Sequence, residues 1–434
     1  MTMELVIALQ RTLLLMRDEF GGSISDEALL HALVGTRVAL VADNKNINSH
    51  SAQVAFVTTA MLMARSGHQV SIIAPNVEML GPQPPLKPGL LVDELMAVGE
   101  VLLPGIRFHK GPPESEIDLA IGIGNTPITV TASRKVSLNC EAWAGILAIE
   151  TDASVWLNRE WPIGALAAAA LGAGEAFKVS IHKLIADAVS PENTSARFAY
   201  SSNVRFELAP HDTLLNPNFG KIDFISGGAI TNAVLYCLAR LPNATGNGRL
   251  FEPDSAKLSN LNRYMLLLRS KCGQAKAVDL ADMVGACFDL KPIAERFDAL
   301  TARAKGSLAP TVITGVDHIP SRWVVQQAGP RWHAIGATTH WSAMASYHTS
   351  DSACARCLHP TDEVGDGPIP TTALVSFWAG LSVAAYIARK TANSVIPKTE
   401  QQVFLSPFRP ESPFRANVAR RPDCPICQAK GLIT

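Results

Sequence analysis

The stretch IDFISGGAITNAVLYCLARLPNATGNGRLFE, residues 222–252, contains the unit from which the fold of this chain can be inferred. IDFIS at 222–226 is a short apolar run typical of a buried strand, and GGAIT follows it as a tight turn. NAVLYCLARL has the composition of a helix, and GRLFE at 248–252 is a second strand. This order predicts the beginning of a Rossmann-like nucleotide-binding unit.

The turn between the first strand and the helix departs from the usual glycine fingerprint. A dinucleotide-binding turn carries three glycines, whereas Ser226 and Thr231 occupy the outer positions here and Gly228 the middle one. Gly227 adds flexibility. Gly-Gly turns before helices are common, so the turn alone is a weak signal. It would still let the backbone N–H groups at a helix N-terminus face an anion.

Polar side chains gather just past the second strand. They are Asp254, Asn260, Asn262, Arg263 and Lys276. Asp254 lies 26 positions after Gly228, a separation at which an acid can accept both hydroxyls of a ribose. Arg263 and Lys276 are candidates for phosphate oxygens. The alternative is an exposed charged helix face, but the mixture of amides and charges around one turn favours a binding site.

The remainder of the second half adds strands and a long helix. PTVITGVD at 310–317 and HAIGATT at 333–339 are typical of strands. LVSFWAGLSVAAYIARK at 374–390 predicts a helix rich in small residues.

The first half of the chain repeats this order. VALVAD (37–42) and VSIIAP (70–75) read as strands on either side of a helix. DLAIGIG (118–124) and GILAIE (145–150) predict further buried parallel strands, and a small-residue helix over 162–184 closes the half.

We therefore predict an α/β fold with two Rossmann-like domains in tandem, which form a pseudo-dimer. Residues 1–190 form the first domain, 221–434 the second, and 191–220 the linker. The first half has no counterpart of the polar cluster, so we expect it to be degenerate and the nucleotide to bind the second half only.

Two CxxC pairs, CARC at 354–357 and CPIC at 424–427, indicate a metal site. Cys354, Cys357, Cys424 and Cys427 supply four thiolates, which is the ligand set of a tetrahedral structural Zn²⁺ site. Four free buried cysteines or a redox pair are the alternatives. Such a knuckle would tie the Pro- and Arg-rich C-terminal tail back to the domain.

The composition excludes several classes of function. The 434 residues include 38 cationic and 38 anionic side chains, so net charge gives no reason to expect a nucleic acid or a membrane as partner. The first residues lack a secretory pattern, and we expect a cytoplasmic protein.

The apolar runs at 164–174 and 373–388 are shorter than a membrane span and predict buried helices.

Joined in this order, the motifs resemble those of the ThiF/MoeB and ubiquitin-activating enzyme superfamily. The resemblance rests on D-x5-N-x-N-R with GQ-x-K (254–276), GVDHIPSRW (315–323), ATTHWSAMASYH (337–348) and the cysteine pairs. The second half carries it, and the first half matches only as a degenerate copy. The arrangement is similar to that of a ubiquitin-activating-like enzyme in which an inactive adenylation domain is fused to an active one.

The resemblance implies ATP-dependent adenylation of the C-terminal carboxylate of a ubiquitin-like protein. It also implies a role for each matching residue. Asp254 would hold the ribose, Arg263 and Lys276 the phosphates, and Asp317 a Mg²⁺ ion, with Arg322 five positions later. The family adds an arginine from the inactive half or a partner, and Arg11 and Arg17 are both candidates.

A later acyl transfer to the enzyme, and from there to a conjugating enzyme, would need a nucleophile. Many relatives place a cysteine in the loop after the first zinc pair, but residues 358–378 contain none. The acyl group could pass to a hydroxyl of Thr371, Thr372 or Ser376, or to an off-pattern cysteine, or the reaction could stop at the adenylate. The off-pattern cysteines are Cys140, Cys237, Cys272 and Cys287.

Two other classes of function compete with this one. The first is a ThiF- or MoeB-like enzyme that activates a sulfur carrier or a modified peptide. The second is a non-catalytic scaffold that binds a ubiquitin-like protein, which the altered glycine turn favours and the intact polar cluster disfavours. The sequence leaves open whether the chain is a monomeric pseudo-dimer or a homodimer.

Overall fold

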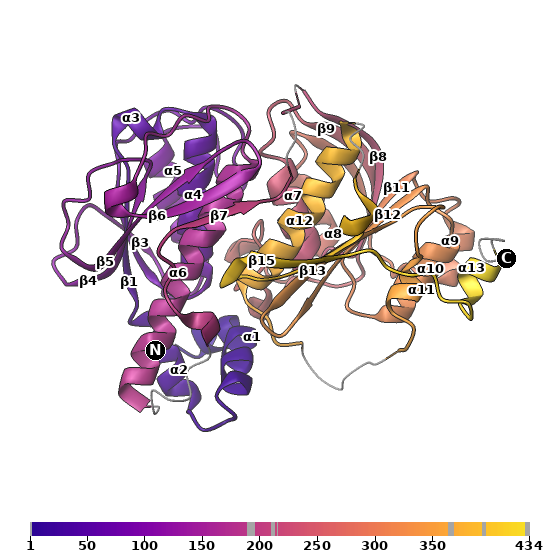
Figure 1. Ribbon diagram of the computed structural model, residues 1–434, viewed down its shortest axis with the longest axis horizontal. Coiled ribbons are helices and arrows are strands. Elements are labelled where there is room, and N and C mark those ends of the chain that lie inside the picture. Colours follow the sequence, from indigo (N-terminus) through magenta and orange to yellow (C-terminus); the bar gives the residue numbers. More distant parts are fainter. Residues whose placement is uncertain are drawn as a thin grey trace.

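The computed structural model describes residues 2–188, 196–209, 213–214, 216–362, 369–392 and 396–429, and it contains two α/β units side by side (Figure 1). The first is built on a seven-stranded sheet with the order β3-β2-β1-β4-β5-β6-β7. The second is built on an eight-stranded sheet with the order β10-β9-β8-β11-β12-β13-β14-β15.

The first unit begins with two helices that precede its sheet. Its elements are α1 (Met3–Glu19), α2 (Asp26–Val34), β1 (Arg37–Val41), α3 (Asn44–Ile47), α4 (His50–Arg65), β2 (Gln69–Ile73), α5 (Leu91–Gly99), β3 (Phe108–Lys110), β4 (Ile117–Ile123), β5 (Ala132–Cys140), β6 (Ala144–Ile149), α6 (Ile163–Ala188) and β7 (Val204–Glu207).

The second unit follows the same plan and adds a C-terminal extension. Its elements are β8 (Asn218–Ile225), α7 (Ala229–Leu238), β9 (Thr245–Phe251), α8 (Lys276–Met283), β10 (Phe288–Ile293), α9 (Ala299–Ala304), β11 (Thr311–Thr314), α10 (Ile319–Gln327), β12 (Trp332–Thr339), β13 (Ser342–His348), α11 (Ala355–Leu358), α12 (Ala373–Thr391), β14 (Gln402–Ser406), β15 (Arg409–Ala416) and α13 (Pro425–Ala429).

The predicted repeat of two Rossmann-like sheets is confirmed for the parallel part of each sheet. The first sheet begins with the order β3-β2-β1-β4, and the second begins with the order β10-β9-β8-β11. In both, the strands that come third, second, first and fourth in the sequence of the unit are neighbours in that order. In each sheet five neighbouring strands run parallel, and the strands after them are antiparallel. Each first strand is followed by a buried helix, α4 or α7.

One predicted strand orientation was wrong. Residues 145–150 were expected to form a parallel strand, but β6 pairs antiparallel with β5. Only residues 141–143 separate β5 from β6. A connection this short closes a hairpin, whereas a parallel pairing needs a crossover of a dozen or more residues.

The segment predicted as a linker, 191–220, contains structure of its own in its described part. β7 lies within it and pairs with β6 as the edge of the first sheet, and β8 already begins at Asn218. Residues 191–195, 210–212 and 215 of that prediction lie outside the described residues. The Pro- and Arg-rich C-terminal tail supplies β14 and β15 to the second sheet.

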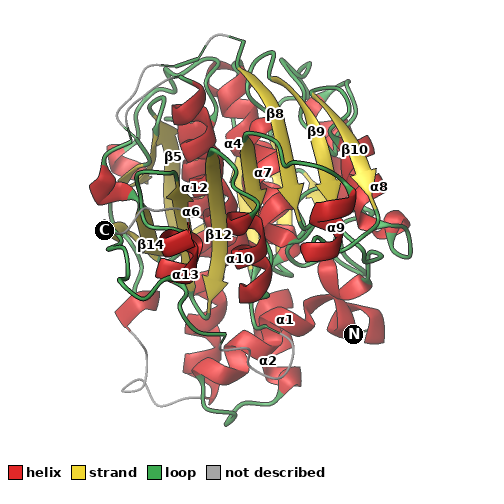
Figure 2. Cartoon of the chain, turned by 90° about the vertical axis from the view of Figure 1, so that its right-hand side faces the viewer, coloured by secondary structure: helices red, strands yellow, loops and turns green. Residues whose placement is uncertain are grey.

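Four buried helices form the layer between the two sheets. α4 and α6 cover the first sheet, α7 and α12 cover the second, and α12 packs on α6 (Figure 1). α9 and α10 lie on the face of the second sheet that points away from the first unit (Figure 2). One apolar cluster continues through both units, and most residues of the helices in this layer are buried.

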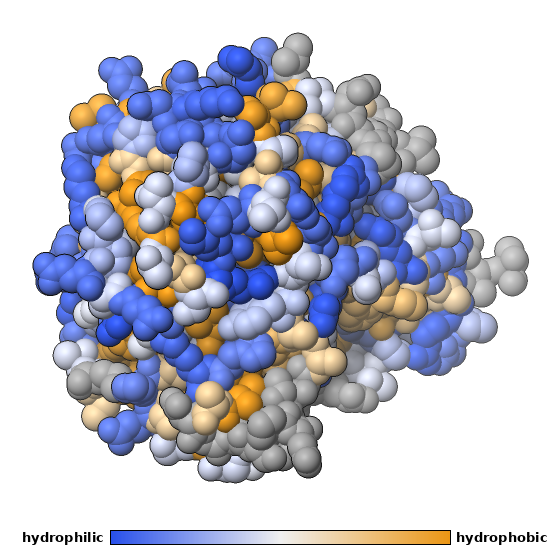
Figure 3. Space-filling view, turned by 60° about the vertical axis from the view of Figure 1, so that its left-hand side comes forward, coloured by the Kyte–Doolittle hydropathy of each residue, from blue (hydrophilic) through white to orange (hydrophobic). Residues whose placement is uncertain are grey.

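One helix in the described part of the chain is long and apolar enough to cross a membrane by length and composition. It is the stretch Ile163–Ala186 of α6, whose apolar window is entirely buried in the structure. Both apolar runs that the sequence assigned to buried helices therefore lie in α6 and α12 of the central layer. The face in Figure 3 is mainly hydrophilic, with apolar residues in small separate patches.

Candidate nucleotide-binding site and metal centre

A cavity of about 640 Å³ lies at the carboxyl end of the second sheet, where the chain leaves β8 and β11. These strands are neighbours, but β9 follows on one side of them and β12 on the other. Open parallel sheets bind ligands at such a switch point. Among the residues that the sequence singled out, the cavity is lined by Arg11, Gly228, Asp254, Asn260, Arg263, Lys276, Asp317, Thr371 and Ser376.

The glycine turn lies at one wall of the cavity. Ser226 has a φ of +89°. This backbone conformation favours glycine, yet the residue here is a serine. Its Oγ accepts a hydrogen bond from the N–H of Gly228 at 3.0 Å. Gly228 is the N-cap of α7, and Ala229 and Ile230 of the first turn line the cavity, so the free N–H groups of a helix N-terminus face it.

An acid that the sequence analysis did not select organises this wall. Glu252, directly after β9, is 5 % exposed, and its carboxylate accepts the N–H of Gly227 at 2.8 Å and that of Asp254 at 3.0 Å. It therefore joins the glycine turn to the end of the neighbouring strand. Gly227 is occupied by this bond and does not line the cavity. The sequence did contain a signal for Glu252, because this acid directly follows an apolar strand.

Asp254 and Lys276 form an ion pair at the rim. Lys276 Nζ lies 3.0 Å from a carboxylate oxygen of Asp254, whose side chain is 63 % exposed, and 3.9 Å from one of Glu252. Burial opposes the charge of Lys276, but Tyr264, Glu252 and Asp254 outweigh it, so its pKa is raised. Lys276 is a cation at neutral pH, and Asp254 can turn an oxygen toward a hydroxyl group of a ligand.

The turn after β9 carries the next group of predicted residues. Asn260 lines the cavity, but its Oδ1 also accepts the N–H of Lys257 at 2.9 Å. Asn262 is fully buried and does not line the cavity; its Nδ2 donates to Thr12 Oγ1 on α1 at 2.9 Å. Its predicted contact with a nucleotide is thus replaced by a contact with the first unit, because the residue faces the interface.

Arg263 and Tyr264 of the same turn reach the cavity. Arg263 Nη1 donates to Asn262 Oδ1 at 2.9 Å and to the carbonyl of Ser259, which fixes the guanidinium. Burial lowers the pKa of Arg263, and the neighbouring Arg11 lowers it further. Tyr264, which sequence reasoning missed, is buried and its phenol lies near Gly228; burial raises its pKa, so the hydroxyl stays protonated at neutral pH.

The structure separates the two candidate arginines of α1. Arg11 lines the cavity, and its Nη1 donates to the carbonyl of Ile369 at 3.1 Å. Burial lowers the pKa of Arg11, while Asp317 and Tyr264 oppose the shift. Arg17 instead pairs with Asp26 at the surface and does not line the cavity. Arg11 thus brings a cation of the first unit to a cavity of the second.

Asp317 faces the cavity from the loop between β11 and α10. Arg322 is buried on α10 and holds that loop from behind, because its Nε and Nη2 donate to the carbonyl of Val316 at 3.1 and 2.8 Å. Its Nη1 lies 3.0 Å from His359 Nε2, which must act as the acceptor. Burial lowers the pKa of Arg322 to about 10. Arg322 therefore positions the loop that carries Asp317.

The candidate nucleophiles differ in position. Thr371 and Ser376 line the cavity, and their hydroxyl oxygens are 3.2 Å apart. The hydroxyl of Thr372 caps α12 by accepting the N–H of Val375, and Thr372 does not line the cavity. Residues 363–368 of the loop in which relatives carry a cysteine lie outside the described residues.

None of the four off-pattern cysteines lines this cavity. Cys140 and Cys237 are buried, whereas Cys272 and Cys287 are partly exposed. Burial raises the pKa of all four thiols, that of Cys140 to about 12. None of them has the lowered pKa typical of a reactive thiolate.

The corresponding place in the first unit is filled by the chain itself. α4 follows β1 as α7 follows β8, but the segment after β6 covers the N-terminus of α4. The Oγ of Ser51 donates to the carbonyl of Asn158 at 2.6 Å and accepts from Trp156 Nε1 at 2.9 Å. The backbone N–H of Ser51 donates to the carbonyl of Arg159 at 3.1 Å. These contacts occupy the helix end that would face an anion.

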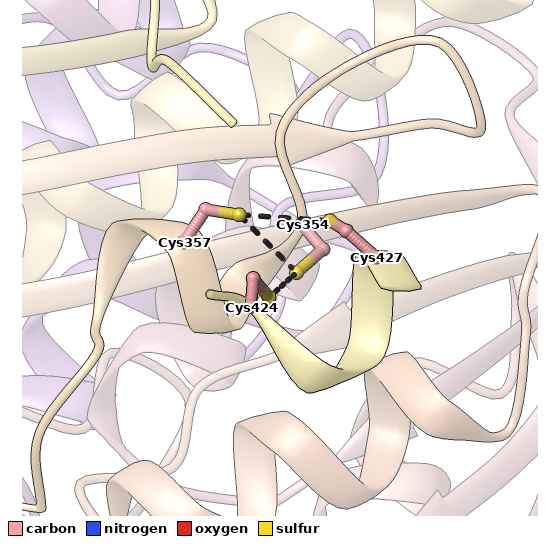
Figure 4. Close-up of side chains that lie close together, drawn as sticks. All are labelled: Cys354, Cys357, Cys424 and Cys427. Carbon is pink, nitrogen blue, oxygen red and sulfur yellow. Dashed lines mark hydrogen bonds between the residues drawn. The ribbon is translucent and has the colours of Figure 1, made fainter. Parts of the chain in front are cut away.

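The side chains of the four cysteines of the two CxxC pairs lie close together (Figure 4). In the sequence, 66 residues separate Cys357 of the first pair from Cys424 of the second. All four are buried, and their ligand atoms lie within 4.8 Å of one another. The Sγ–Sγ distances are 3.7 Å for Cys354–Cys357, 3.4 Å for Cys354–Cys424 and 3.6 Å for Cys357–Cys427. Four sulfurs at about 2.3 Å from a tetrahedral Zn²⁺ have similar separations, so the cluster is compatible with zinc.

Comparison with known proteins adds a family match for part of the first unit. Residues 37–190, about a third of the chain, match the model of the BilD N-terminal domain. A protein of Sinorhizobium fredii, named uncharacterized protein y4jF, is 26% identical over 241 residues, which are 53% of this chain and 46% of that protein. The chain thus spans about half the length of this curated relative.

Solved structures give more distant likenesses. Escherichia coli MccB, crystallised with MccA, is 17% identical with a TM-score of 0.41 and covers 48% of this chain and 66% of its own. MccB has also been solved with ATP. PaaA is 14% identical with a TM-score of 0.37 and covers 46% of this chain and 73% of its own.

Proposed function

We propose that this protein uses ATP to adenylate the C-terminal carboxylate of a polypeptide. The observation that carries the proposal is the cavity at the switch point of the second sheet. There a helix N-terminus, three cations (Arg11, Arg263 and Lys276) and the carboxylate of Asp317 meet from five separate segments. Positive side chains and backbone N–H groups near the carboxylate of Asp317 suit a triphosphate with a divalent cation, while Glu252 and Asp254 also line the cavity beside Lys276.

The residues present fit such a ligand. The N-terminus of α7 and the side chains of Arg263 and Lys276 would hold phosphate oxygens, and Asp254 at the rim would accept ribose hydroxyls. Asp317 would supply one oxygen ligand to Mg²⁺, which typically keeps waters and binds through one or two carboxylates plus phosphate. Arg322 keeps the Asp317 loop in place through the carbonyl of Val316.

In the proposed reaction a carboxylate oxygen of the substrate forms a bond to the α-phosphorus of ATP. The bond between the α-phosphorus and the bridging oxygen breaks, and pyrophosphate leaves with the electron pair. The chain's task is to align the two reactants and to neutralise the charge that develops on the phosphates. Arg11 is placed to contribute to this from the first unit.

Within this reaction we propose a ubiquitin-like protein as the polypeptide. The resemblance of the second half to ubiquitin-activating enzymes supports this choice. The tandem arrangement agrees with it, because the site of the first unit is filled by the chain itself and that of the second unit is an open cavity. A modified peptide or a sulfur carrier is the alternative substrate of the same chemistry. A purely non-catalytic scaffold would not need the convergent cations described above.

The proposal can be tested by ATP–pyrophosphate exchange. Asp317→Asn and Lys276→Met should each lower the exchange rate by about 10²–10³, as expected for removal of one preorganised charge. Lys271→Met is the matched control, because Lys271 lies in the same segment but pairs with Asp279 and does not line the cavity. Full exchange activity in both site variants would overturn the assignment.

The same assay distinguishes the substrates. Exchange that appears only with a small protein ending in a free flexible tail would support the ubiquitin-like substrate. Exchange with short peptides alone would favour the alternative, and nucleotide binding without exchange on any carboxylate would favour the scaffold.

The acyl group, if it passes to the enzyme, should form an ester rather than a thioester. Among the residues that the structure describes, no cysteine lines the cavity, whereas Thr371 and Ser376 do. A covalent adduct that resists a thiol reductant and is lost in Thr371→Val or Ser376→Ala is the expected result. A reductant-sensitive adduct lost in Cys272→Ser would contradict it.

A further inference from the structure

Arg65, the last residue of α4, is a fully buried cation of the first unit whose guanidinium donates its hydrogen bonds to the second. Its Nη1 donates to the carbonyl of Leu261 at 2.5 Å. Its Nη2 donates to the carbonyls of Met265 and Leu267 at 3.1 and 2.8 Å. The guanidinium therefore binds three backbone carbonyls of one short turn, which runs from 261 to 267.

Placing a guanidinium here has a clear physical cost. Burial lowers the pKa of Arg65 to about 9, so the side chain is still cationic at neutral pH but is poorly solvated. An apolar side chain would pack in this layer without that cost. The turn, however, is irregular, and buried carbonyls need donors. An arginine fork can supply several donors to carbonyls that no sheet or helix serves.

The same turn carries residues of the cavity. Arg263 and Tyr264 lie between the carbonyls that Arg65 binds, and both line the cavity, whereas Arg65 does not. Asn262 adds a second tie to the first unit through Thr12 on α1. The turn is thus held by the first unit at four points.

Arg240 is the counterpart of Arg65 in the second unit. Both arginines follow an alanine at the C-terminal end of the helix between the first two strands of their sheets, and both are fully buried. Arg240 also crosses the interface, because its Nη2 donates to the carbonyl of Pro84 at 2.7 Å. Its other bond is to Tyr236 of its own helix. Neither Pro84 nor Tyr236, whose carbonyls accept from Arg240, lines the cavity.

We infer that Arg65 is a positioning residue for the cavity of the second unit: it fixes the 261–267 turn from behind and so places Arg263 and Tyr264. The degenerate first unit is on this account a structural part of the nucleotide site, in addition to supplying Arg11. The inference concerns the same cavity as the proposed function and rests on that function only for its activity readout.

The test compares Arg65→Met with Arg240→Met, and Arg65→Lys with Arg240→Lys, in the full chain. Both methionine variants should lower the melting temperature, since each leaves buried carbonyls without donors. Only Arg65→Met should weaken the binding of ATP, by tenfold or more, and raise the KM for ATP in exchange. Arg65→Lys should recover part of the affinity, because one ammonium can still donate to some of the three carbonyls.

Hydrogen exchange supplies a readout that does not depend on catalysis. Amides of the segment 258–268 should exchange faster in Arg65→Met than in wild type, and should be unchanged in Arg240→Met. If Arg65→Met does not fold, the two lysine variants decide between the positions in the same way.

Two results would overturn the inference. The first is a folded Arg65→Met protein with unchanged protection of 258–268 and unchanged ATP affinity. The second is an equal loss of affinity in the Arg240 variants, which would show a general effect of destabilisation. If wild-type protein binds no nucleotide, the proposed function fails, and exchange of the 258–268 amides alone decides whether Arg65 positions the turn.

Discussion

Ser226 shows how a single residue in the glycine turn departs from its usual chemistry. Its φ of +89° lies in a region where the backbone of any residue other than glycine is strained. Such strain costs about 1–3 kcal/mol of stability. Its hydroxyl partly offsets that cost by accepting the N–H of Gly228 and lying 3.3 Å from a carboxylate oxygen of Glu252. The residue keeps the turn that glycine normally makes while adding a side chain to it.

A comparison of two substitutions isolates the backbone strain at Ser226. Both Ser226→Gly and Ser226→Ala remove the hydroxyl, but only the alanine keeps the strained backbone. We expect the glycine variant to be more stable than the alanine variant by about 1–2 kcal/mol, the reverse of the usual order. Denaturant unfolding of the two proteins measures the difference. An alanine variant that equals or exceeds the glycine variant would show that φ is not positive there.

His68 gives the fold a dependence on pH. It is fully buried, and its Nδ1 donates to the carbonyl of Leu33 at 3.0 Å. Burial lowers the pKa of His68 to about 4, against 6.5 for an exposed histidine. Between these values the unfolded chain binds a proton that the folded chain does not, so stability falls as pH falls from 6.5 toward 4.

We expect this histidine to contribute up to about 1.4 kcal/mol per pH unit to that loss. In His68→Asn the amide can donate to Leu33 in place of Nδ1 but does not titrate. The unfolding free energy of the variant, measured at several pH values between 4.5 and 7, should therefore change less steeply than that of wild type. Parallel curves for the two proteins would contradict the assignment.

At the scale of elements, the cysteine knuckle connects the end of the chain to one wall of the cavity in the second unit. α11 and α13 each carry part of a CxxC pair, and His359, two residues after Cys357, accepts from Arg322. Trp323 Nε1 also donates to the carbonyl of His359 at 2.9 Å. A metal that orders the knuckle would thus also support α10 and the loop with Asp317.

Purified protein should contain about one Zn²⁺ per chain, and Cys424→Ser should lose it. Because a structural zinc contributes folding energy, this variant should melt at least about 5 °C below wild type and exchange pyrophosphate more slowly. Cys287→Ser is the control, since Cys287 lies outside the knuckle. Elemental analysis and thermal melting provide the measurements. A metal-free protein with the wild-type melting temperature would exclude a structural zinc.

At the scale of the whole molecule, the helical layer joins the two units through one shared apolar core. Tyr236 of α7 is fully buried; its hydroxyl lies 2.9 Å from that of Thr58 on α4, and its ring packs edge-on against Phe377 of α12. His50 Nε2 donates to the carbonyl of Arg240 at 2.7 Å. The apolar cluster around these contacts continues into both sheets.

Tyr236→Ala should therefore destabilise both units, by about 3–5 kcal/mol. Hydrogen exchange of the full chain measures this: amides of β1 in the first sheet and of β8 in the second should lose protection together. Phe297→Ala, on the face of the second sheet away from the first unit, should affect the second sheet more than the first. Loss of protection confined to β8 in Tyr236→Ala would show two independently unfolding units.

The sequence by itself indicated the repeat and its principal elements, although strands such as β5 and β14 were not predicted. Strands such as β1 and β8 appear as short β-branched runs, and α6 and α12 as long small-residue runs, because side-chain periodicity and composition are local properties of the chain. The cysteine pairs also indicated their own cluster, since four thiolates at CxxC spacing have few other uses. Asp254, Arg263, Lys276 and Asp317, which the sequence singled out, all line one cavity in the structure.

Only the tertiary structure decided what depends on residues distant in sequence. It chose Arg11 over Arg17, turned Asn262 toward α1, and gave Glu252 the task of joining two turns. It also showed that the segment after β6 fills the first site and that Arg65 reaches the 261–267 turn, 196 residues away at Leu261. Contacts of this kind arise when packed layers bring distant backbone into reach, and no local pattern encodes which carbonyl an arginine will meet.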